Sequence, residues 1–346
     1  MKDKISVLMT GAGAPGGPGI IRAIQADSNV KLWVADADPL ATGRFLNELF
    51  VRIPSAKESN FIDFVLKLCI KEGINVIFPL VTLELFEFSR NKAKFLKHGI
   101  KIIVSDFEYL SISNDKSKLL LHLKNHNVVV PDFYVVKNLK ELNAGCKLLG
   151  YPAKSVVIKP SVSNGSRGVR VLNSSIDEYN HLFNQKPNNI FSNLEKINAI
   201  LYDKEFPELL VSEYLPGDEF TIDTIVNNGE AKIVIPRLRR KMNGGISVSG
   251  QFKNDPLLIE YCKSILGTMN LDGPIGIQVK LDVNGEYKVL EINPRIQGTS
   301  VAALGIGVNL PLIAIHQCFT DKDYSGIDIN WNTGFSRYYS EVFYDI

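Results

Sequence analysis

Apolar strands and amphipathic helices alternate along the N-terminal third of the chain. Strand ISVLMT leads through a glycine-rich turn into helix GIIRAIQA, and strand KLWVADAD, helix NFIDFVLKLCIKEG and strand INVIFPL follow. Strands that alternate with helical patterns are typical of a parallel sheet with crossover helices. We therefore predict a Rossmann-like α/β domain over residues 1–105.

The pattern changes after residue 105. Two amphipathic helices are followed by VVIKPSVSNGSRGVRVL, which is typical of a strand, a glycine-containing loop and a second strand. From Leu209 onward strand patterns dominate, and the Asn228-Gly229 and Asn284-Gly285 pairs predict antiparallel hairpins. We expect a second, α+β domain over residues 106–346, with a central or lid part at 106–208 and a C-terminal part at 209–346. The polar segment 173–208 is the least regular, and whether it is an ordered lid element stays open.

Composition excludes several classes of function. The 346 residues are 45% hydrophobic and 22% charged, with a net charge of +2, so no overall field favours nucleic acid or a membrane surface. No apolar run approaches the roughly 20 residues that span a bilayer, and the N-terminus lacks the pattern of a signal peptide. The four cysteines form no CxxC pair. We expect a cytoplasmic protein with small-molecule partners.

Three oxygen donors lie in two short apolar strands of the C-terminal part. Gln278 is in GPIGIQVKLD, and Glu291 and Asn293 are in KVLEINPR. If the two strands are neighbours, these side chains lie close together. Mg²⁺ prefers oxygen ligands, and substrate phosphates usually complete its coordination shell. Only Glu291 carries a charge, so we expect a Mg²⁺ site that assembles with MgATP, in which Mn²⁺ could substitute.

Lys159 ends the strand VVIK, directly before a loop of small residues. A lysine on a rigid strand offers a fixed charge to phosphate oxygens, while the backbone N–H groups of small residues can close over them. The small residues are Ser163, Gly165, Ser166 and Gly168. The alternative is an exposed hairpin tip with a solvated lysine.

The glycines near the N-terminus match a second, different pattern. Gly11, Gly13 and Gly16 satisfy GxGxxG, and Asp36 follows at the end of the next strand, as in a dinucleotide site. Pro15 and Pro18 remove N–H donors from the same loop. We therefore favour a turn that serves packing or another ligand, and keep an NAD-linked oxidoreductase as the alternative.

Two further segments carry candidate binding groups. EYLPGDE places Glu213 and Glu219 at the two ends of a turn, where backbone groups could grip a base and a carboxylate could bind a ribose. In IPRLRRKMNGG, Arg237 and Arg239 share one face of a strand, where two guanidinium groups could hold a carboxylate or an acyl phosphate. A polar turn and a solvated edge strand are the alternatives.

Taken in order, these pieces resemble the ATP-grasp superfamily, most closely the ATP-binding halves of carbamoyl phosphate synthetase large subunits. The matching segments run from Asp106 to Cys318. They are Asp115-Lys116, VVIKPS with its loop, EYLPGDEFTID, IGIQVKLD, and VLEINPRIQGTS running into ALGIGVNLP. The N-terminal α/β domain also looks like the domain that precedes the grasp unit in this superfamily.

The resemblance implies a role for each matching residue. Lys116 and Lys159 would contact ATP phosphates, and Ser163 to Gly168 would form a phosphate lid. The adenine pocket would be lined by Glu213, Tyr214 and Leu215, with Glu219 on the ribose. The metal ligands would be Gln278, Glu291 and Asn293, and Arg295 would face the transferred phosphate.

The chain also departs from this family. Both phosphate-binding lysine positions are typically arginines there, and the large subunit has two grasp units where this chain shows one. The resemblance therefore implies a stand-alone carboxylate–amine ligase that forms an amide through an acyl phosphate, and suggests a homodimer. A kinase that forms carbamate or carboxy phosphate, and a non-catalytic nucleotide-binding module, are the alternatives.

Overall fold

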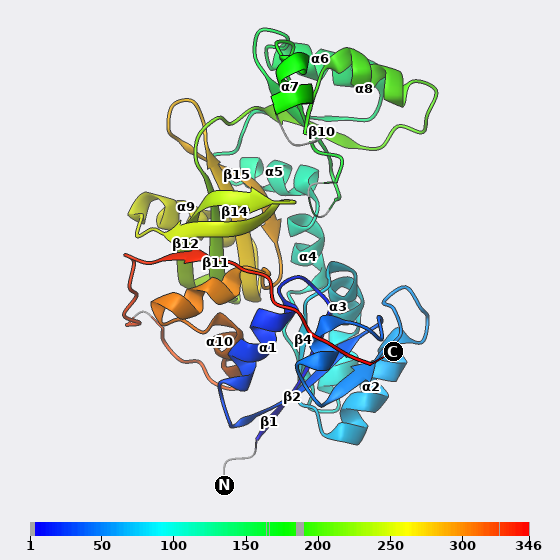
Figure 1. The fold of residues 1–346 in the computed structure, drawn as a ribbon, viewed down its shortest axis with the longest axis vertical. Coiled ribbons are helices and arrows are strands. Elements are labelled where there is room, and N and C mark those ends of the chain that lie inside the picture. The colour runs from blue at the N-terminus through cyan, green and yellow to red at the C-terminus, as the bar shows by residue number, and fades with distance from the viewer. Residues whose placement is uncertain (1–3, 164, 166, 185–189, 325, 346) are drawn as a thin grey trace.

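The computed structural model describes residues 4–163, 165, 167–184, 190–324 and 326–345 (Figure 1). They form three sheets with the strand orders β3-β2-β1-β4-β5, β6-β10-β7-β8-β9 and β15-β14-β11-β12-β13-β16. The first sheet is parallel, and the third is antiparallel throughout. The predicted combination of a Rossmann-like domain and an antiparallel α+β region is confirmed.

The N-terminal sheet is parallel, and helical segments connect its consecutive strands, as crossover connections between parallel strands require. Its elements are β1 (Ile5–Thr10), α1 (Gly17–Gln25), β2 (Val30–Asp36), η1 (Thr42–Phe45), β3 (Phe50–Arg52), α2 (Phe61–Glu72), β4 (Val76–Pro79), α3 (Thr82–Leu96) and β5 (Lys101–Ile102). Strand order reverses beside β1, with β2 on one side and β4 on the other. Ligands of open α/β sheets bind at such a switch point, beyond the carboxyl ends of the strands.

The second sheet lies at the top of Figure 1, with its helices around it. Its elements, with the helices that lead into it, are α4 (Phe107–Ser113), α5 (Lys116–Asn125), β6 (Phe133–Val136), α6 (Leu139–Leu148), β7 (Val156–Pro160), β8 (Arg170–Leu172), α7 (Glu178–Asn184), β9 (Phe191–Ser192), α8 (Leu194–Leu201) and β10 (Leu209–Glu213). Strands β7 and β8 form the predicted hairpin. Strand β10 pairs with β6 and β7, so residues 209–213 belong to the second sheet although they follow the expected boundary at residue 208. The limits of the domains stay predictions.

The third sheet holds both predicted Asn-Gly hairpins. Its elements are β11 (Glu219–Asn227), β12 (Glu230–Asn243), β13 (Ile246–Phe252), α9 (Pro256–Leu266), β14 (Gly273–Leu281), β15 (Tyr287–Asn293), η2 (Ser300–Ile306), α10 (Leu310–Gln317) and β16 (Gly334–Ser336). Asn228 and Gly229 have φ values of 49° and 78°, which a two-residue type I′ turn requires. After β16 the chain runs across to the N-terminal sheet, where Tyr344 stacks on Phe45 (Figure 1).

One hydrophobic core joins the first and third sheets. Ile21 and Ile24 of α1 pack in the same cluster as Ile235 of β12 and Ile315 of α10. The opposite face of the N-terminal sheet packs on α2 and α3, and the opposite face of the third sheet packs on α5 and α9. Because burial of this shared apolar surface stabilises both sheets together, their loops are held in a fixed arrangement.

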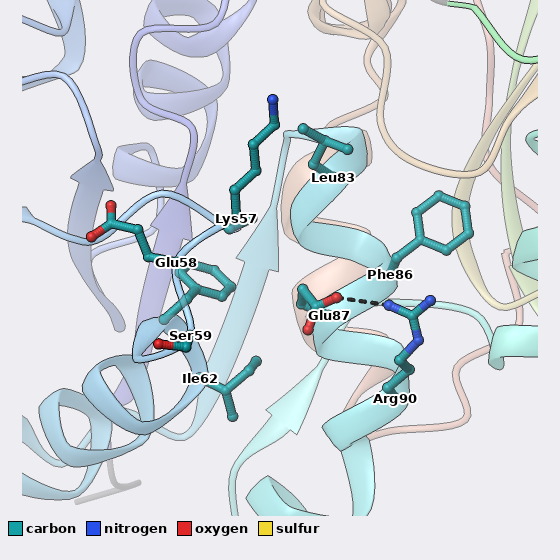
Figure 2. A pocket seen from close by; sticks show the side chains of 10 residues that line it. Lys57, Glu58, Ser59, Ile62, Leu83, Phe86, Glu87 and Arg90 are labelled. Atoms are coloured by element: carbon teal, nitrogen blue, oxygen red, sulfur yellow. Dashed lines mark hydrogen bonds and ion pairs between the residues drawn. The ribbon is translucent and has the colours of Figure 1, made fainter.

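A hollow of about 530 Å³ lies between the start of α2 and α3, where Lys57, Glu58, Leu83, Phe86 and Arg90 border it (Figure 2). In the described part of the chain no single helix is long and apolar enough to cross a membrane, and only the bent pair η2 and α10 passes that test together.

Candidate nucleotide and substrate site

A cleft of about 1290 Å³ opens where loops from all three sheets meet. The N-terminal sheet contributes Ala14, Pro15 and Gly16 after β1, and Leu80 after β4. These residues follow the carboxyl ends of the strands that flank the switch point. Nearly all the residues predicted to bind nucleotide or metal also line it: Lys116, Lys159, Ser163, Gly165, Glu213, Tyr214, Leu215, Glu219, Gln278, Glu291, Asn293 and Arg295.

The floor of the cleft is a polar row across the third sheet. Glu291 pairs with Gln278, and Gln278 pairs with Thr221 on the next strand, so their side chains emerge side by side on one face. Asn293 lies two residues beyond Glu291, on the same face of β15. The structure thus brings together the three predicted metal ligands.

The donor set fits a weakly held Mg²⁺. Glu291 supplies the one carboxylate, Gln278 and Asn293 supply amide oxygens, and Asn293 Nδ2 donates to Glu291 Oε1 over 3.2 Å. Among the described residues no group of three or more His, Cys, Asp or Glu could hold a metal ion. Oxygen ligands of this kind suit Mg²⁺, with most of the remaining shell left for phosphates and water.

Lys116 stands at the start of α5 and is held there by several contacts. Asp115 caps the helix by accepting from Ser117 N and Lys118 N, and Lys116 N donates to Ser161 O over 2.8 Å. Its ammonium donates to Ser163 O over 2.9 Å and lies 3.3 Å from Glu291 Oε2. The side chain is therefore oriented toward both the loop after β7 and the carboxylate of Glu291, a predicted metal ligand.

Lys159 crosses from the second sheet to the third. Its Nζ donates to Leu290 O over 3.2 Å, at the position where β15 bulges against β14. A bulge leaves a backbone group without a hydrogen-bond partner on the neighbouring strand. Here the Leu290 carbonyl instead accepts from the Lys159 ammonium. Burial lowers the pKa of Lys159 to about 8, although the nearby Glu291 carboxylate opposes this shift. A second anion such as a phosphate would be strongly attracted to this desolvated charge.

The loop after β7 requires glycine at two positions. Gly165 and Gly168 have φ values of 64° and 78°, and a Cβ on Gly168 would lie 2.6 Å from Pro160. Ser163 and Gly165 line the cleft. Ser166, which the resemblance places in the same lid, lies outside the described residues.

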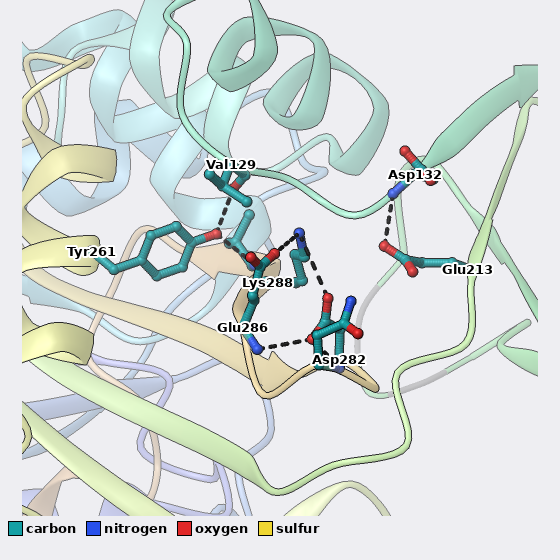
Figure 3. A network of polar contacts seen from close by, with 9 residues as sticks. Val129, Asp132, Glu213, Tyr261, Asp282, Glu286 and Lys288 are labelled. Carbon is teal, nitrogen blue, oxygen red and sulfur yellow. Dashed lines mark hydrogen bonds and ion pairs between the residues drawn. The ribbon is translucent and has the colours of Figure 1, made fainter.

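The linker after β10 borders the other end of the cleft. Glu213 Oε1 accepts from Asp132 N over 2.9 Å, as Figure 3 shows, so one carboxylate oxygen is already used. Lys280 lies with its ammonium 5.3 Å from the Tyr214 ring centroid and also lines the cleft. The sequence analysis missed Lys280, although its position two residues after Gln278 puts it on the same face of β14.

Arg237 and Arg239 of β12, which were predicted to hold a carboxylate or an acyl phosphate, are both paired with carboxylates of the protein. Arg239 lines the cleft but forms an ion pair with Glu219, the predicted ribose ligand, and also donates to Ser247 and to Gly245 O. Arg237 is 1% exposed and its Nε lies 2.5 Å from Asp223 Oδ2. The described residues that line the cleft do not include Arg237. Both guanidinium groups are paired because carboxylates of β11 lie next to them. The alternation of residues along β12 does not reveal these neighbours.

A cationic end of the cleft lies beside the N-terminal glycine-rich loop. It is formed by Gly16, Arg295, Gln297, Gly298 and Arg337, all of which line the cleft. Arg295 donates to Ile296 O over 3.0 Å, and Arg337 Nη2 donates to Pro15 O over 3.2 Å. Gln297 is 9% exposed, and its Nε2 has no partner among the described residues. Nothing in the sequence pattern pointed to Arg337, which reaches the cleft only through the pairing of β16 with β13.

The glycine-rich loop itself serves packing. A Cβ on Gly16 would lie 2.2 Å from Gly298 Cα, so the two backbones touch. Asp36, the residue that a dinucleotide site would use for the ribose, accepts from Gly13 N over 2.8 Å. The loop therefore packs against the segment that follows β15, and it also borders the cleft.

Comparisons with known proteins agree with this geometry. Residues 205–335 match a family described as ATP-grasp in the biosynthetic pathway with Ter operon, and residues 7–103 match a PylC-like N-terminal domain. The carbamoyl phosphate synthase large chain of Clostridium acetobutylicum is 28% identical over 274 residues, which are 75% of this chain and 23% of that protein. This chain thus spans about a quarter of that relative.

Solved structures share the whole fold. Biotin carboxylase from Campylobacter jejuni, in complex with an ATP analogue, has a TM-score of 0.67 at 17% identity, covering 94% of this chain and 73% of that one. Carboxyaminoimidazole ribonucleotide synthase from Aspergillus clavatus, complexed with ATP, has a TM-score of 0.68 at 15% identity, covering 92% and 78%. The chain is therefore similar to an ATP-grasp family over residues 205–335 and to a PylC-like N-terminal domain over residues 7–103, and it shares its fold with these two solved structures.

Proposed function

We propose that this protein is an ATP-dependent carboxylate–amine ligase, which forms an amide through an acyl phosphate and releases ADP. The observation that carries the proposal is the convergence of Lys116, Lys159 and Glu291 beside a separate cationic end of the same cleft. The same cleft would then bind the phosphates of the nucleotide at one place and an acidic acceptor at its cationic end.

The nucleotide would lie between the second and third sheets. Its phosphates would meet Lys116 and Lys159, beside Ser163 and Gly165 of the loop after β7. The base would lie against Tyr214 and Leu215, and the ribose beside Glu219. Gln278, Glu291 and Asn293 would hold Mg²⁺, which supplies charge neutralisation at the phosphates.

The acceptor carboxylate would bind at the cationic end. Arg295 and Arg337 supply positive charge there, and the unpartnered Gln297 amide supplies a donor. Guanidinium groups suit carboxylates because their planar forks match carboxylate geometry. Arg239, which is already paired with Glu219, belongs to the nucleotide side rather than to this end.

The chemistry follows from this placement. A carboxylate oxygen attacks the γ-phosphorus, the bond from that phosphorus to the β–γ bridging oxygen breaks, and ADP leaves. The amine nitrogen then attacks the acyl carbon, phosphate leaves with the C–O electron pair, and the amine proton passes to phosphate or water. Lys116, Lys159 and Arg295 neutralise charge that develops on the transferring group, which is the main catalytic task in phosphoryl transfer.

An ADP-release assay tests the proposal. Purified protein with MgATP is supplied with pairs of carboxylates and amines, and products are analysed for amide by mass spectrometry. We expect one pair to give equal amounts of ADP, phosphate and amide. ADP release without amide for every pair would contradict ligation.

A second candidate, formation of carboxy phosphate or carbamate, is supported by the sequence relative named carbamoyl phosphate synthase. It predicts ADP release that depends on bicarbonate and needs no carboxylate substrate. A non-catalytic module would bind ATP without turnover, and an NAD-linked oxidoreductase would bind NADH instead of MgATP. We also propose that residues 1–105 and 106–346 are the two domains of the enzyme.

A further inference from the structure

We propose that the buried pair Asp223 and Arg237 is a positioning pair, which holds the loop Gln297–Ser300 in place as one wall of the acceptor end of the cleft. Arg237 would thus act on the acceptor through this loop and not by touching it. The positioning role itself is independent of the proposed function. Only the statement that this wall contacts an acceptor rests on the proposed function.

The contacts form a closed network beneath the loop. Arg237 Nε donates to Asp223 Oδ2 over 2.5 Å, and Arg237 Nη2 donates to Thr299 Oγ1 over 3.0 Å. Asp223 Oδ1 accepts from Ser300 Oγ over 2.6 Å, and Ser300 Oγ accepts in turn from Gln297 N over 3.1 Å. Arg237 therefore binds Thr299, and Asp223 binds Ser300.

The loop is also confined from its other sides. Gly298 touches the backbone of Gly16, and the Gln297 side chain covers Gly276 so closely that a Cβ there would lie 1.9 Å from Gln297 Nε2. Gln297, Gly298 and Thr299 line the cleft. A shift of the loop by a fraction of an ångström would therefore move the Gln297 amide and the Thr299 side chain relative to any acceptor.

The contribution of this ion pair to the stability of the fold does not by itself explain its presence. Arg237 and Asp223 are 1% and 2% exposed, and Arg237 Nη1 has no hydrogen-bond partner among the described residues. Removing two charges from water is costly, and apolar residues of similar volume often replace such pairs with no loss of stability. What the pair supplies, and apolar residues cannot, is directed hydrogen bonds to Thr299 and Ser300.

The neighbouring pair on the same two strands provides a matched contrast. Arg239 and Glu219 also join β12 to β11, and both line the cleft. The further described partners of Arg239 are Ser247 and Gly245 O, in the hairpin between β12 and β13. Changes to this pair should therefore alter nucleotide binding, whereas changes to Asp223 and Arg237 should alter acceptor use.

The test replaces the positioning pair by apolar residues, as Asp223→Leu combined with Arg237→Met. Hydrogen exchange of the backbone is measured by mass spectrometry over peptides covering residues 296–301, together with the affinity for a non-hydrolysable ATP analogue. We expect exchange in that segment to rise by about tenfold or more, because its local opening loses two anchoring contacts. Affinity for the analogue should stay within about twofold, since the nucleotide groups are untouched.

Single-contact variants keep the inference testable if the double variant does not fold. Thr299→Val removes the acceptor of Arg237 Nη2, and Ser300→Ala removes the donor to Asp223. Both should raise exchange in the same segment, while Lys263→Met, which disrupts an exposed pair with Glu260, should not. Unchanged exchange over residues 296–301 in folded variants would overturn the positioning role.

Activity distinguishes this inference from the proposed function. With any carboxylate that stimulates ADP release from the wild type, the variants should show a KM for that carboxylate raised by about tenfold, with a smaller change in KM for ATP. A raised KM for ATP alone would also overturn the inference. If no carboxylate stimulates the wild type, the proposed function fails, and the exchange measurement still decides whether the pair positions the loop.

Discussion

Lys116 Nζ lies 3.3 Å from Glu291 Oε2, with side chains that are 7% and 27% exposed. Lys116 is a predicted phosphate ligand, and Glu291 is the one charged residue among the three predicted metal ligands. The carboxylate therefore offsets the lysine charge, and under the proposed function a bound metal–nucleotide complex would separate the two groups. Metal and nucleotide should consequently bind together.

Mg²⁺ should bind weakly without nucleotide. We expect a Kd of about 1 mM or weaker from calorimetry, because one carboxylate and two amides give little charge to the ion. Glu291→Gln should weaken binding of an MgATP analogue. The same variant should leave binding of metal-free ATP equal or tighter, because Lys116 loses its competing partner. Tight Mg²⁺ binding by the nucleotide-free protein would contradict this expectation.

Nucleotide affinity should fall at alkaline pH. Burial lowers the pKa of Lys159 to about 8, so the ammonium is charged below that pH and loses its charge above it. Measured between pH 7 and 9, the Kd of an ATP analogue should rise above pH 8 by up to about tenfold per pH unit. Lys159→Arg keeps the charge and should flatten the profile; an equally steep profile in that variant would exclude Lys159 as the cause.

Glu84 should make the protein less stable as pH rises from acid toward neutral. It accepts from Thr10 Oγ1 over 2.5 Å at the carboxyl end of β1, and burial raises its pKa from 4.5 to about 7. The folded chain therefore binds this proton more tightly than the unfolded chain. That contribution is complete below about pH 4.5 and is lost as pH rises to about 7.

Glu84→Gln should therefore be more stable than the wild type at pH 8 by up to about 3 kcal/mol, and much less so at pH 5. Urea unfolding at the two pH values measures the difference. Glu108→Gln, an exposed change on α4, is the control and should show no such pH dependence. An equal effect of Glu84→Gln at both pH values would show that its charge is not the cause.

Gly16→Ala should separate the glycine-rich loop from the third sheet. Gly16 has φ −93° and ψ −12°, which alanine adopts freely, so the added Cβ acts only through its 2.2 Å approach to Gly298 Cα. We expect a lower melting temperature and impaired use of the acceptor, with nucleotide binding retained. Gly145→Ala in α6, where a Cβ would lie 3.4 Å from its nearest neighbour, should be neutral or mildly stabilising. Equal melting temperatures for the two variants would contradict the packing role.

Local patterns explain why much of the fold was predictable. The hairpin at Asn228 and Gly229 depends on left-handed backbone angles that these two residues adopt readily, and the alternation of β14 and β15 specifies which side chains share a face. Gln278 and Glu291 were therefore predicted as neighbours from sequence.

Contacts between distant segments could not be predicted in the same way. Alternation places Arg237 and Arg239 on one face but says nothing about Asp223 and Glu219, which lie on a neighbouring strand. The approach of Gly16 to Gly298 depends on how two sheets pack, and Arg337 enters the cleft through an edge strand with little apolar pattern. Sequence reasoning identified the candidate ligands but not which of their charges are already neutralised by partners.

The polar row on the third sheet limits which changes the sequence of this sheet can accept. Glu291, Gln278, Thr221 and Arg237 are consecutive cross-strand neighbours on four strands. Deleting one residue within β14 would turn Gln278 to the opposite face and separate the metal ligands from one another. A substitution in the loops around the row does not change the strand register, so Gln278 and Glu291 would remain cross-strand neighbours.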